Sequence, residues 1–348
     1  MSQEYLKNYK RYIEITTTIG CPNNCSYCPQ DLLNQSYKGE DKILTFEDFK
    51  LILKNIPKNI QIDFGGMTEP FTNPQTVDMI LYADKLGYEL MLYTTLRNFS
   101  INDIYRLKNV KFLGCVVHTV DEDNLIKNKV DEEYLKKIKL LKELNYSNLD
   151  FMVIGRPRKD IENAIGYKLK TTKILLRGNY LNKEEFKNIS PDIIEPFQGE
   201  FKNNKKPLIC GSLVNTRRTF RPTLAERTVM LPNGDVVLCC MDYALQHPLG
   251  NLKQQHYSKI INSNAMKTIE ASMLGKNDKY LLCRECEWAI PYNQKKWLKS
   301  RLFDNWIKTQ LKLNKFYLHL FPNLRKQLFL LDLKFGKIYS LTLKIGHI

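Results

Sequence analysis

Short apolar runs alternate with segments of helical periodicity along the first half of the chain. The runs are rich in Ile, Val, Leu, Phe and Thr, as β-strands are. They occupy residues 12–18, 60–64, 89–94, 111–118, 149–154 and 172–176. Strands that alternate with helices are typical of βα units and a mostly parallel sheet.

Helix starts can be recognised between these runs. Thr45 and Ser100 each precede an Asp by three residues, which is a weaker relative of the capping box, and Asp131 opens an acidic first turn. Asn73-Pro74 reads as a cap followed by proline at the first helical position. Right-handed crossovers between six such units predict a partial (β/α)6 barrel over residues 12–190, with functional groups at the carboxyl ends of its strands.

The second half of the chain changes character. Residues 230–240 predict a hairpin, with Asn233-Gly234-Asp235 as the turn between two apolar strands. We expect a small α+β module over residues 191–290 and a basic amphipathic helical tail over residues 291–348.

Composition indicates a globular protein. The 348 residues are 43% hydrophobic, which is enough to bury a substantial core. The first residues do not resemble a signal peptide, and no run reaches the ~20 apolar residues of a spanning helix. We therefore expect a cytoplasmic protein, in which nine cysteines serve as metal ligands and free thiols rather than as disulfides.

Three cysteines are the most informative feature of the sequence. Cys21, Cys25 and Cys28 have the spacing C-x3-C-x2-C and directly follow the first predicted strand. Three thiolates can ligate three irons of a cubic iron-sulfur cluster and leave the fourth iron open to a small molecule. The alternatives are a zinc site, which needs four ligands, and a disulfide, which cannot pair three close cysteines.

At these residues the chain resembles the radical S-adenosylmethionine (SAM) superfamily, whose signature has an aromatic residue before the third cysteine, here Tyr27. The resemblance implies that a 4Fe-4S cluster with an open iron binds SAM, and that its one-electron reduction releases a 5'-deoxyadenosyl radical. That radical takes a hydrogen atom from substrate. An electron donor such as flavodoxin or ferredoxin is implied as a partner.

Further cofactor contacts follow from the same resemblance. Gly65, Gly66 and Glu69 after the second strand are similar to the family's Gly-Gly-Glu-Pro motif, with two extra residues before the glutamate. Arg177-Gly178-Asn179 at the sixth strand is similar to a motif that lies beside the nucleoside in relatives. The remaining candidates end the third and fourth strands, and for them ordinary strand-end packing is the alternative: Thr94, Thr95, His118 and Thr119.

A second set of cysteines follows the predicted hairpin. The spacing of Gly234 and Cys239 resembles the auxiliary-cluster domain of the SPASM and twitch families, as does the run 248–252. One auxiliary 4Fe-4S cluster of the shorter twitch kind is implied, with Cys210, Cys239, Cys283 and Cys286 as ligands. Cys240 could replace Cys239, and a four-cysteine zinc site remains an alternative. Cys240 and Cys115 are then spare thiols, which either pack as small hydrophobes or return a hydrogen atom to substrate.

The tail carries much of the chain's net charge of +16, because residues 291–348 hold 12 Lys or Arg and two Asp. Bases interleaved with Trp, Phe, Tyr and Leu are typical of a helix at a membrane interface, which would place the protein peripherally at the inner membrane face. A helix packed on the core with a solvated basic face is the alternative. We expect no nucleic-acid partner.

The sequence therefore predicts a radical SAM enzyme with one auxiliary cluster. Relatives oxidise or epimerise sugars and cyclitols or modify ribosomal peptides. The barrel begins almost at once, without room for an N-terminal peptide-recognition domain, so we expect a small carbohydrate-like substrate. The alternatives are a peptide maturase and a non-catalytic, zinc-bearing module that binds RNA or a membrane.

Overall fold

The computed structural model describes residues 11–177, 180–181, 186, 201, 204–210 and 227–292. The chain divides into two compact units, Met1–Pro291 and Tyr292–Ile348. Residues 293–348, and with them nearly all of the predicted basic tail, lie outside the described residues, as does the predicted domain boundary at residue 190. No helix in the described ranges has the length and apolarity needed to cross a membrane.

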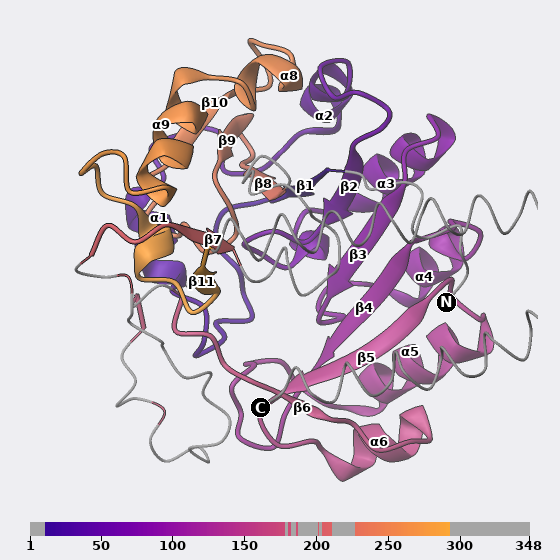
Figure 1. The fold of residues 1–348 in the computed structure, drawn as a ribbon. Coiled ribbons are helices and arrows are strands. Elements are labelled where there is room, and N and C mark those ends of the chain that lie inside the picture. The colour runs from indigo at the N-terminus through magenta and orange to yellow at the C-terminus, as the bar shows by residue number, and fades with distance from the viewer. Residues whose placement is uncertain are drawn as a thin grey trace, which may run out of the picture. The chain divides into compact units, whose positions relative to one another are not determined.

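One sheet forms the centre of the first unit (Figure 1). Within the described residues it has nine strands in the order β10-β9-β8-β1-β2-β3-β4-β5-β6. Strands β1 to β6 are parallel and neighbour one another in chain order, which makes them a partial (β/α) barrel. Their bounds are Tyr12–Ile15, Gln61–Phe64, Leu90–Thr94, Gly114–Thr119, Leu149–Ile154 and Thr171–Thr172.

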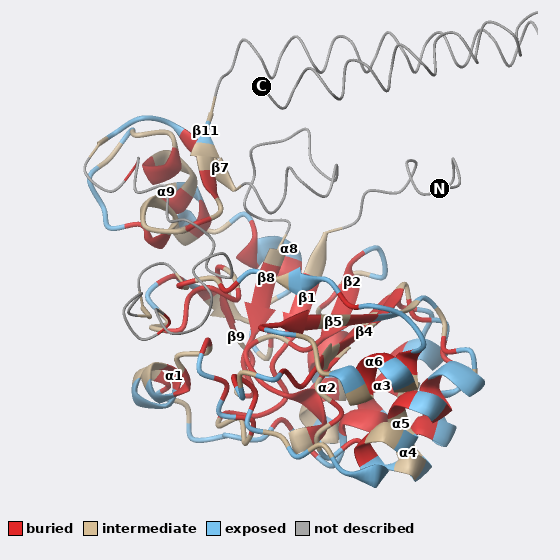
Figure 2. Ribbon diagram, turned by 90° about the horizontal axis from the view of Figure 1, so that it is seen from below, coloured by how far each residue is buried: buried red, intermediate tan, exposed pale blue. Residues whose placement is uncertain are grey.

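Helices cover one face of the parallel strands, and Figure 2 shows that their buried sides face the sheet. They are α2 (Phe46–Leu53), α3 (Thr76–Lys85), α4 (Ile101–Leu107), α5 (Glu132–Glu143) and α6 (Lys159–Ile165), while α1 (Gln30–Ser36) follows the cysteine loop. Alternate strand residues such as Ile13, Ile62 and Leu92 are fully buried in the core between sheet and helices.

The other face of the same strands carries several polar side chains beside Met91, Val116 and Met152. Successive strand residues point to opposite faces, so the neighbours of the core residues point away from the helices. Glu14 pairs in register with Asp63, and both are buried. Gln61 donates to Asp63 at 2.6 Å, and Tyr93 and His118 continue this face on β3 and β4. A barrel interior lined by hydrogen-bonding groups suits a polar ligand.

The second half of the first unit extends the barrel sheet. β8 (Arg227–Met230) lies parallel to β1, and β9 (Asp235–Val237) and β10 (Pro248–Asn251) follow antiparallel. An ion pair of 2.8 Å between Arg227 and Glu14 joins β8 to β1. Further elements are α8 (Tyr257–Ile260), α9 (Asn264–Met273) and a two-stranded sheet of β7 (Leu208–Cys210) and β11 (Ala289–Pro291).

Most predicted elements are confirmed, and β5 has the predicted bounds. Thr45 caps α2, Ser100 and Asp103 form a complete capping box on α4, and Asp131 caps α5. The hairpin at 230–240 is also confirmed.

Several predictions about element ends are wrong. The first strand ends at Ile15 rather than at residue 18, and the fourth begins at Gly114 rather than at residue 111. The sixth strand covers only Thr171–Thr172, and within the described residues it pairs with β5; Ile174 and Leu176 beyond it are buried.

Asn73-Pro74 does not start a helix, because α3 begins later, at Thr76. The Asn73 Oδ1 accepts from Gln75 N at 2.9 Å, while its amide donates to the carbonyls of Thr17 and Leu44 at 3.0 and 2.7 Å.

Candidate active site

The first cysteine loop lies between β1 and α1, at the carboxyl edge of the parallel strands. Its backbone is tied to the loop after β4: Ser26 N donates to Leu125 O at 2.9 Å, and Lys127 N donates to Asn23 O at 2.9 Å. The Asn23 side chain also donates to Thr95 Oγ1 at 2.8 Å. Two neighbouring strand ends therefore hold the loop in place.

Hydrogen-bond donors point at the sulfurs of this loop. Glu69 N approaches Cys21 Sγ at 3.4 Å, and Tyr243 OH approaches Cys28 Sγ at 3.7 Å. Interaction with Cys25 lowers the pKa of Cys28, whereas burial raises the pKa of Cys21 to about 11, so a metal must displace the Cys21 proton on binding. Donors that favour thiolate suit metal ligation. The three thiols and these donors fit an iron-sulfur group held by three protein ligands.

The glycine loop after β2 contacts the cysteine loop through Gln30. The Gln30 amide donates to Met67 O at 2.7 Å, and its oxygen accepts from Cys21 N at 3.4 Å. Gly66 has φ +65°, and a Cβ there would lie 2.4 Å from Thr16 Oγ1. Only glycine permits this approach to β1. Sequence reasoning missed Gln30 and Thr16, which no motif distinguishes.

Glu69 is buried and its carboxylate is fully engaged by protein donors. Oε1 accepts from Thr94 Oγ1 at 2.7 Å and Phe71 N at 3.4 Å, while Oε2 accepts from Thr95 N at 2.6 Å and Thr95 Oγ1 at 2.7 Å. Burial raises the pKa of Glu69. The carboxylate thus ties the glycine loop to the end of β3, and the direct cofactor contacts predicted for Glu69 and Thr94 stay predictions.

His118 and Arg177 approach the same mouth from β4 and from the segment after β6. Burial and the positive charge of Arg177 lower the pKa of His118 to about 4, so the imidazole is neutral at pH 7. The Arg177 guanidinium lies over the Tyr243 ring, 5.7 Å from its centroid, and Arg177 Nε is buried without a hydrogen-bond partner. Asn179 lies outside the described residues, and Tyr27 is buried beside Cys25 and Cys28.

The second set of cysteines shares one pocket. Apolar side chains and Arg227 complete a lining that includes Cys210, Cys239, Cys240, Cys283 and Cys286. The pairing of β7 with β11 sets Cys210 opposite Ala289, and the 3-10 turn η6 (Leu282–Arg284) presents Cys283. Burial raises the pKa of Cys283, so a metal must displace the proton on binding. Across the described ranges, no three His, Cys, Asp or Glu are placed closely enough to bind one ion.

Cys239 and Cys240 differ in their surroundings. The charges that act on Cys239 include those of Cys283 and Cys286, whereas Arg227 Nη2 donates to Cys240 Sγ at 2.8 Å. Cys240 therefore belongs to the Arg227–Glu14 pair on the barrel sheet, and Cys239 fits the shared cysteine site better. A group ligated by thiolates fits the sulfur donors of this pocket.

One set of cysteines on a parallel βα barrel and another in a second pocket are the donors expected of an iron-sulfur enzyme with an auxiliary cluster. Two family models match the sequence: the radical SAM superfamily over residues 15–166, and an iron-sulfur cluster-binding domain, SPASM, over residues 223–287. The chain belongs to the radical SAM superfamily and carries a SPASM-type auxiliary-cluster domain. It binds SAM and 4Fe-4S clusters, and the alternative of a non-catalytic zinc-bearing module is wrong.

Solved structures share the fold. BtrN in complex with AdoMet and 2-DOIA has a TM-score of 0.51 and 13% identity, covering 81% of this chain and 98% of that chain. Streptococcus suis SuiB bound to precursor peptide SuiA has a TM-score of 0.52 and 12% identity, covering 81% of this chain and 70% of that chain. No curated protein sequence matches the chain.

Proposed function

We propose that this enzyme abstracts a hydrogen atom from a small, carbohydrate-like substrate and oxidises or epimerises it. The bound cofactors would supply the 5'-deoxyadenosyl radical, while the chain binds the substrate, orients it and excludes water. The observation that carries the proposal is the set of polar side chains on the interior face of the barrel strands. Glu14, Gln61, Asp63, Tyr93 and His118 present hydrogen-bonding groups there, which match a substrate rich in hydroxyl groups.

The two cysteine sets have separate roles in this proposal. Cys21, Cys25 and Cys28 would hold the cluster that binds SAM at the mouth of the barrel. Cys210, Cys239, Cys283 and Cys286 would hold the auxiliary cluster, which can accept an electron. Gly65, Gly66 and Glu69 would shape the loop beside SAM.

The fate of the substrate radical depends on the spare thiols. Cys115 is fully buried among apolar residues on the helix side of the sheet, and burial raises the pKa of its thiol to about 12. Cys240 instead lines the auxiliary pocket, and its charged neighbours include Arg177, which also acts on Cys28. If a thiol returns the hydrogen atom, Cys240 is the candidate and the reaction is an epimerisation; the thiyl radical left behind would then take one electron from the external reductant and one proton from solvent. If none does, the substrate radical would lose one electron to the auxiliary cluster and one proton to solvent, and the reaction is an oxidation.

The experiment uses anaerobically reconstituted enzyme with dithionite, SAM and candidate sugars or cyclitols in D2O. Formation of 5'-deoxyadenosine that depends on substrate supports hydrogen abstraction. Because a thiol exchanges its proton with solvent, an epimerised product would carry one deuterium at the reacting carbon. Cys240→Ala should abolish that labelling, and Cys115→Ala should not. Absence of deoxyadenosine from the wild-type enzyme contradicts the proposal.

A peptide-modifying activity is the second candidate. Its support is the fold shared with SuiB, whose structure contains a precursor peptide. A short precursor-peptide gene beside this one, together with peptide-dependent formation of deoxyadenosine, would favour it over the carbohydrate-like substrate.

A further inference from the structure

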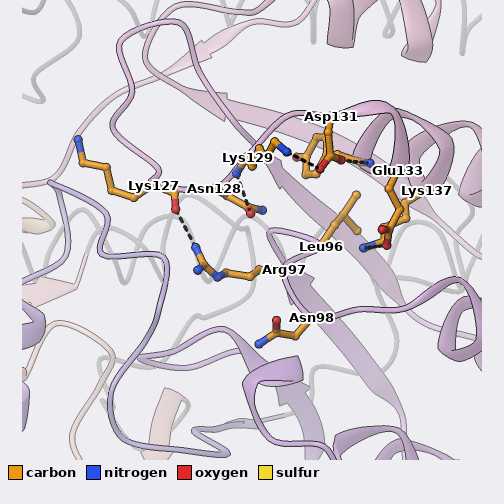
Figure 3. A pocket seen from close by; sticks show the side chains of 10 residues that line it. Leu96, Arg97, Asn98, Lys127, Asn128, Lys129, Asp131, Glu133 and Lys137 are labelled. Carbon is orange, nitrogen blue, oxygen red and sulfur yellow. Dashed lines mark hydrogen bonds and ion pairs between the residues drawn. The ribbon is translucent and has the colours of Figure 1, made fainter.

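A basic pocket lies on the outer rim of the barrel mouth (Figure 3). The loops after β3 and β4 and the first turns of α5 line an open pocket of about 380 Å³. Its cationic side chains are Arg97, Lys127, Lys129 and Lys137, and its two acids are Asp131 and Glu133, so the lining has a net charge of +2.

The acids and cations of the pocket are arranged in pairs. Lys137 contacts Glu133 at 2.9 Å, and Lys129 contacts Asp131 at 3.6 Å. Arg97 Nη1 donates to the carbonyl of Lys127 at 2.7 Å and joins the two loops. Lys127 is exposed and the Lys129 side chain is 83% exposed, so both lysines reach solvent at the rim, although Lys129 is paired with Asp131. Because the acids inside the pocket are ion-paired with lysines, little charge is left there to bind a small anion. The exposed lysines at the rim can instead contact a broad acidic protein surface.

The rim is directly bonded to the segment that presents the catalytic cysteines. Lys127 N donates to the carbonyl of Asn23, which lies between Cys21 and Cys25. Asn128 also donates to Thr95 O at 3.3 Å, and Thr95 accepts from Asn23. A protein docked at this pocket would therefore stand next to the first cysteine loop.

We propose that the pocket is the docking surface for an acidic one-electron carrier protein. This inference rests on the proposed function, because the carrier would reduce the iron-sulfur group held by Cys21, Cys25 and Cys28. One electron leaves the reduced carrier and enters that group, and no covalent bond or proton is transferred. Complementary charge would mainly accelerate association and would weaken as salt rises.

The test compares two reductants on the full-length reconstituted enzyme. The variant is Lys127→Glu/Lys129→Glu, and Lys127→Gln/Lys129→Gln serves as a milder pair. The matched control is Lys85→Glu/Lys108→Glu, which changes the same net charge at the carboxyl ends of α3 and α4, at the opposite end of the barrel. Formation of 5'-deoxyadenosine is measured with dithionite and, separately, with increasing concentrations of a reduced bacterial flavodoxin.

With flavodoxin, we expect kcat/KM of the Lys127/Lys129 Glu variant to fall about tenfold or more at low salt and to lose most of its salt dependence. The kcat/KM of the Lys127→Gln/Lys129→Gln variant should fall less, and that of the control variant should stay within about twofold of wild type. With dithionite, all variants should match wild type, because the substitutions keep the Lys127 backbone N–H that donates to the first cysteine loop. Equal losses in variant and control, or an unchanged kcat/KM in both Lys127/Lys129 pairs, would overturn the docking surface. Lack of dithionite-driven turnover in wild type would instead overturn the proposed function.

Discussion

Replacement of Glu69 by Gln should destabilise the protein by about 1–3 kcal/mol, the range for one orphaned buried donor. The carboxylate accepts from Thr94 Oγ1, Thr95 N, Thr95 Oγ1 and Phe71 N. An amide nitrogen cannot accept a hydrogen bond. In the Gln variant the amide nitrogen is best placed at the position of Oε1. There the Thr94 hydroxyl can turn and accept a hydrogen bond from this nitrogen, so only the 3.4 Å bond from Phe71 N is lost. Glu69→Ala removes every acceptor and should lose about 4 kcal/mol or more.

The measurement is urea unfolding of the reduced apoprotein, with Glu47→Gln as the control. The Glu47 side chain is 77% exposed and makes a surface ion pair with Lys50, so its replacement should change stability by less than about 0.5 kcal/mol. If Glu69→Gln is as stable as the Glu47→Gln control, the hydrogen-bond argument for the glycine loop is refuted.

Three further predictions concern the glycine loop, pH and the auxiliary cluster. Gly66→Ala should lower the free energy of unfolding in urea by about 2 kcal/mol or more, because the new Cβ would meet Thr16. Gly87→Ala is the control: Gly87 has φ +78° and open space around it, so its replacement should lower that free energy by only about 1 kcal/mol. The pKa of His118 is about 4 in the folded state and about 6.5 in the unfolded state, so the unfolded state binds more protons between these two pH values. The free energy of unfolding should therefore rise with pH across that window by up to about 3 kcal/mol. The variant His118→Gln should lack this part of the pH dependence. Cys283→Ala should lower iron from about eight to about four per chain while deoxyadenosine formation with dithionite persists, and an unchanged iron content would contradict its role as a ligand.

Local patterns were sufficient for much of the fold. The strand at 149–154 and the caps at Thr45, Ser100 and Asp131 depend on residues close in sequence, and the structure has them as predicted. Asn73 shows where this reasoning fails. Its Oδ1 still accepts from Gln75 N, but its amide also donates to two carbonyls of distant loops, and α3 begins only at Thr76.

The candidate site was predictable only where spacing carries the chemistry. The C-x3-C-x2-C triad identified the first cysteine loop, because all three thiols lie on one short segment. Gln30, Thr16 and the Arg227–Glu14 pair could not be found, since each acts through a partner on another element. The choice of Cys239 over Cys240 likewise needed the position of Arg227 in space.

The pairing of β1 with β8 has a consequence during synthesis on the ribosome. β1 emerges early, but residues 227–230, which cover its outer edge, are made more than two hundred residues later. Until then the nascent barrel exposes unpaired backbone groups along β1, beside the loop that must acquire iron. Because the pairing of β1 with β8 joins segments so far apart in the sequence, it slows folding and leaves the growing chain open to aggregation. The yield of folded protein should therefore depend on chaperones that shield the edge of β1.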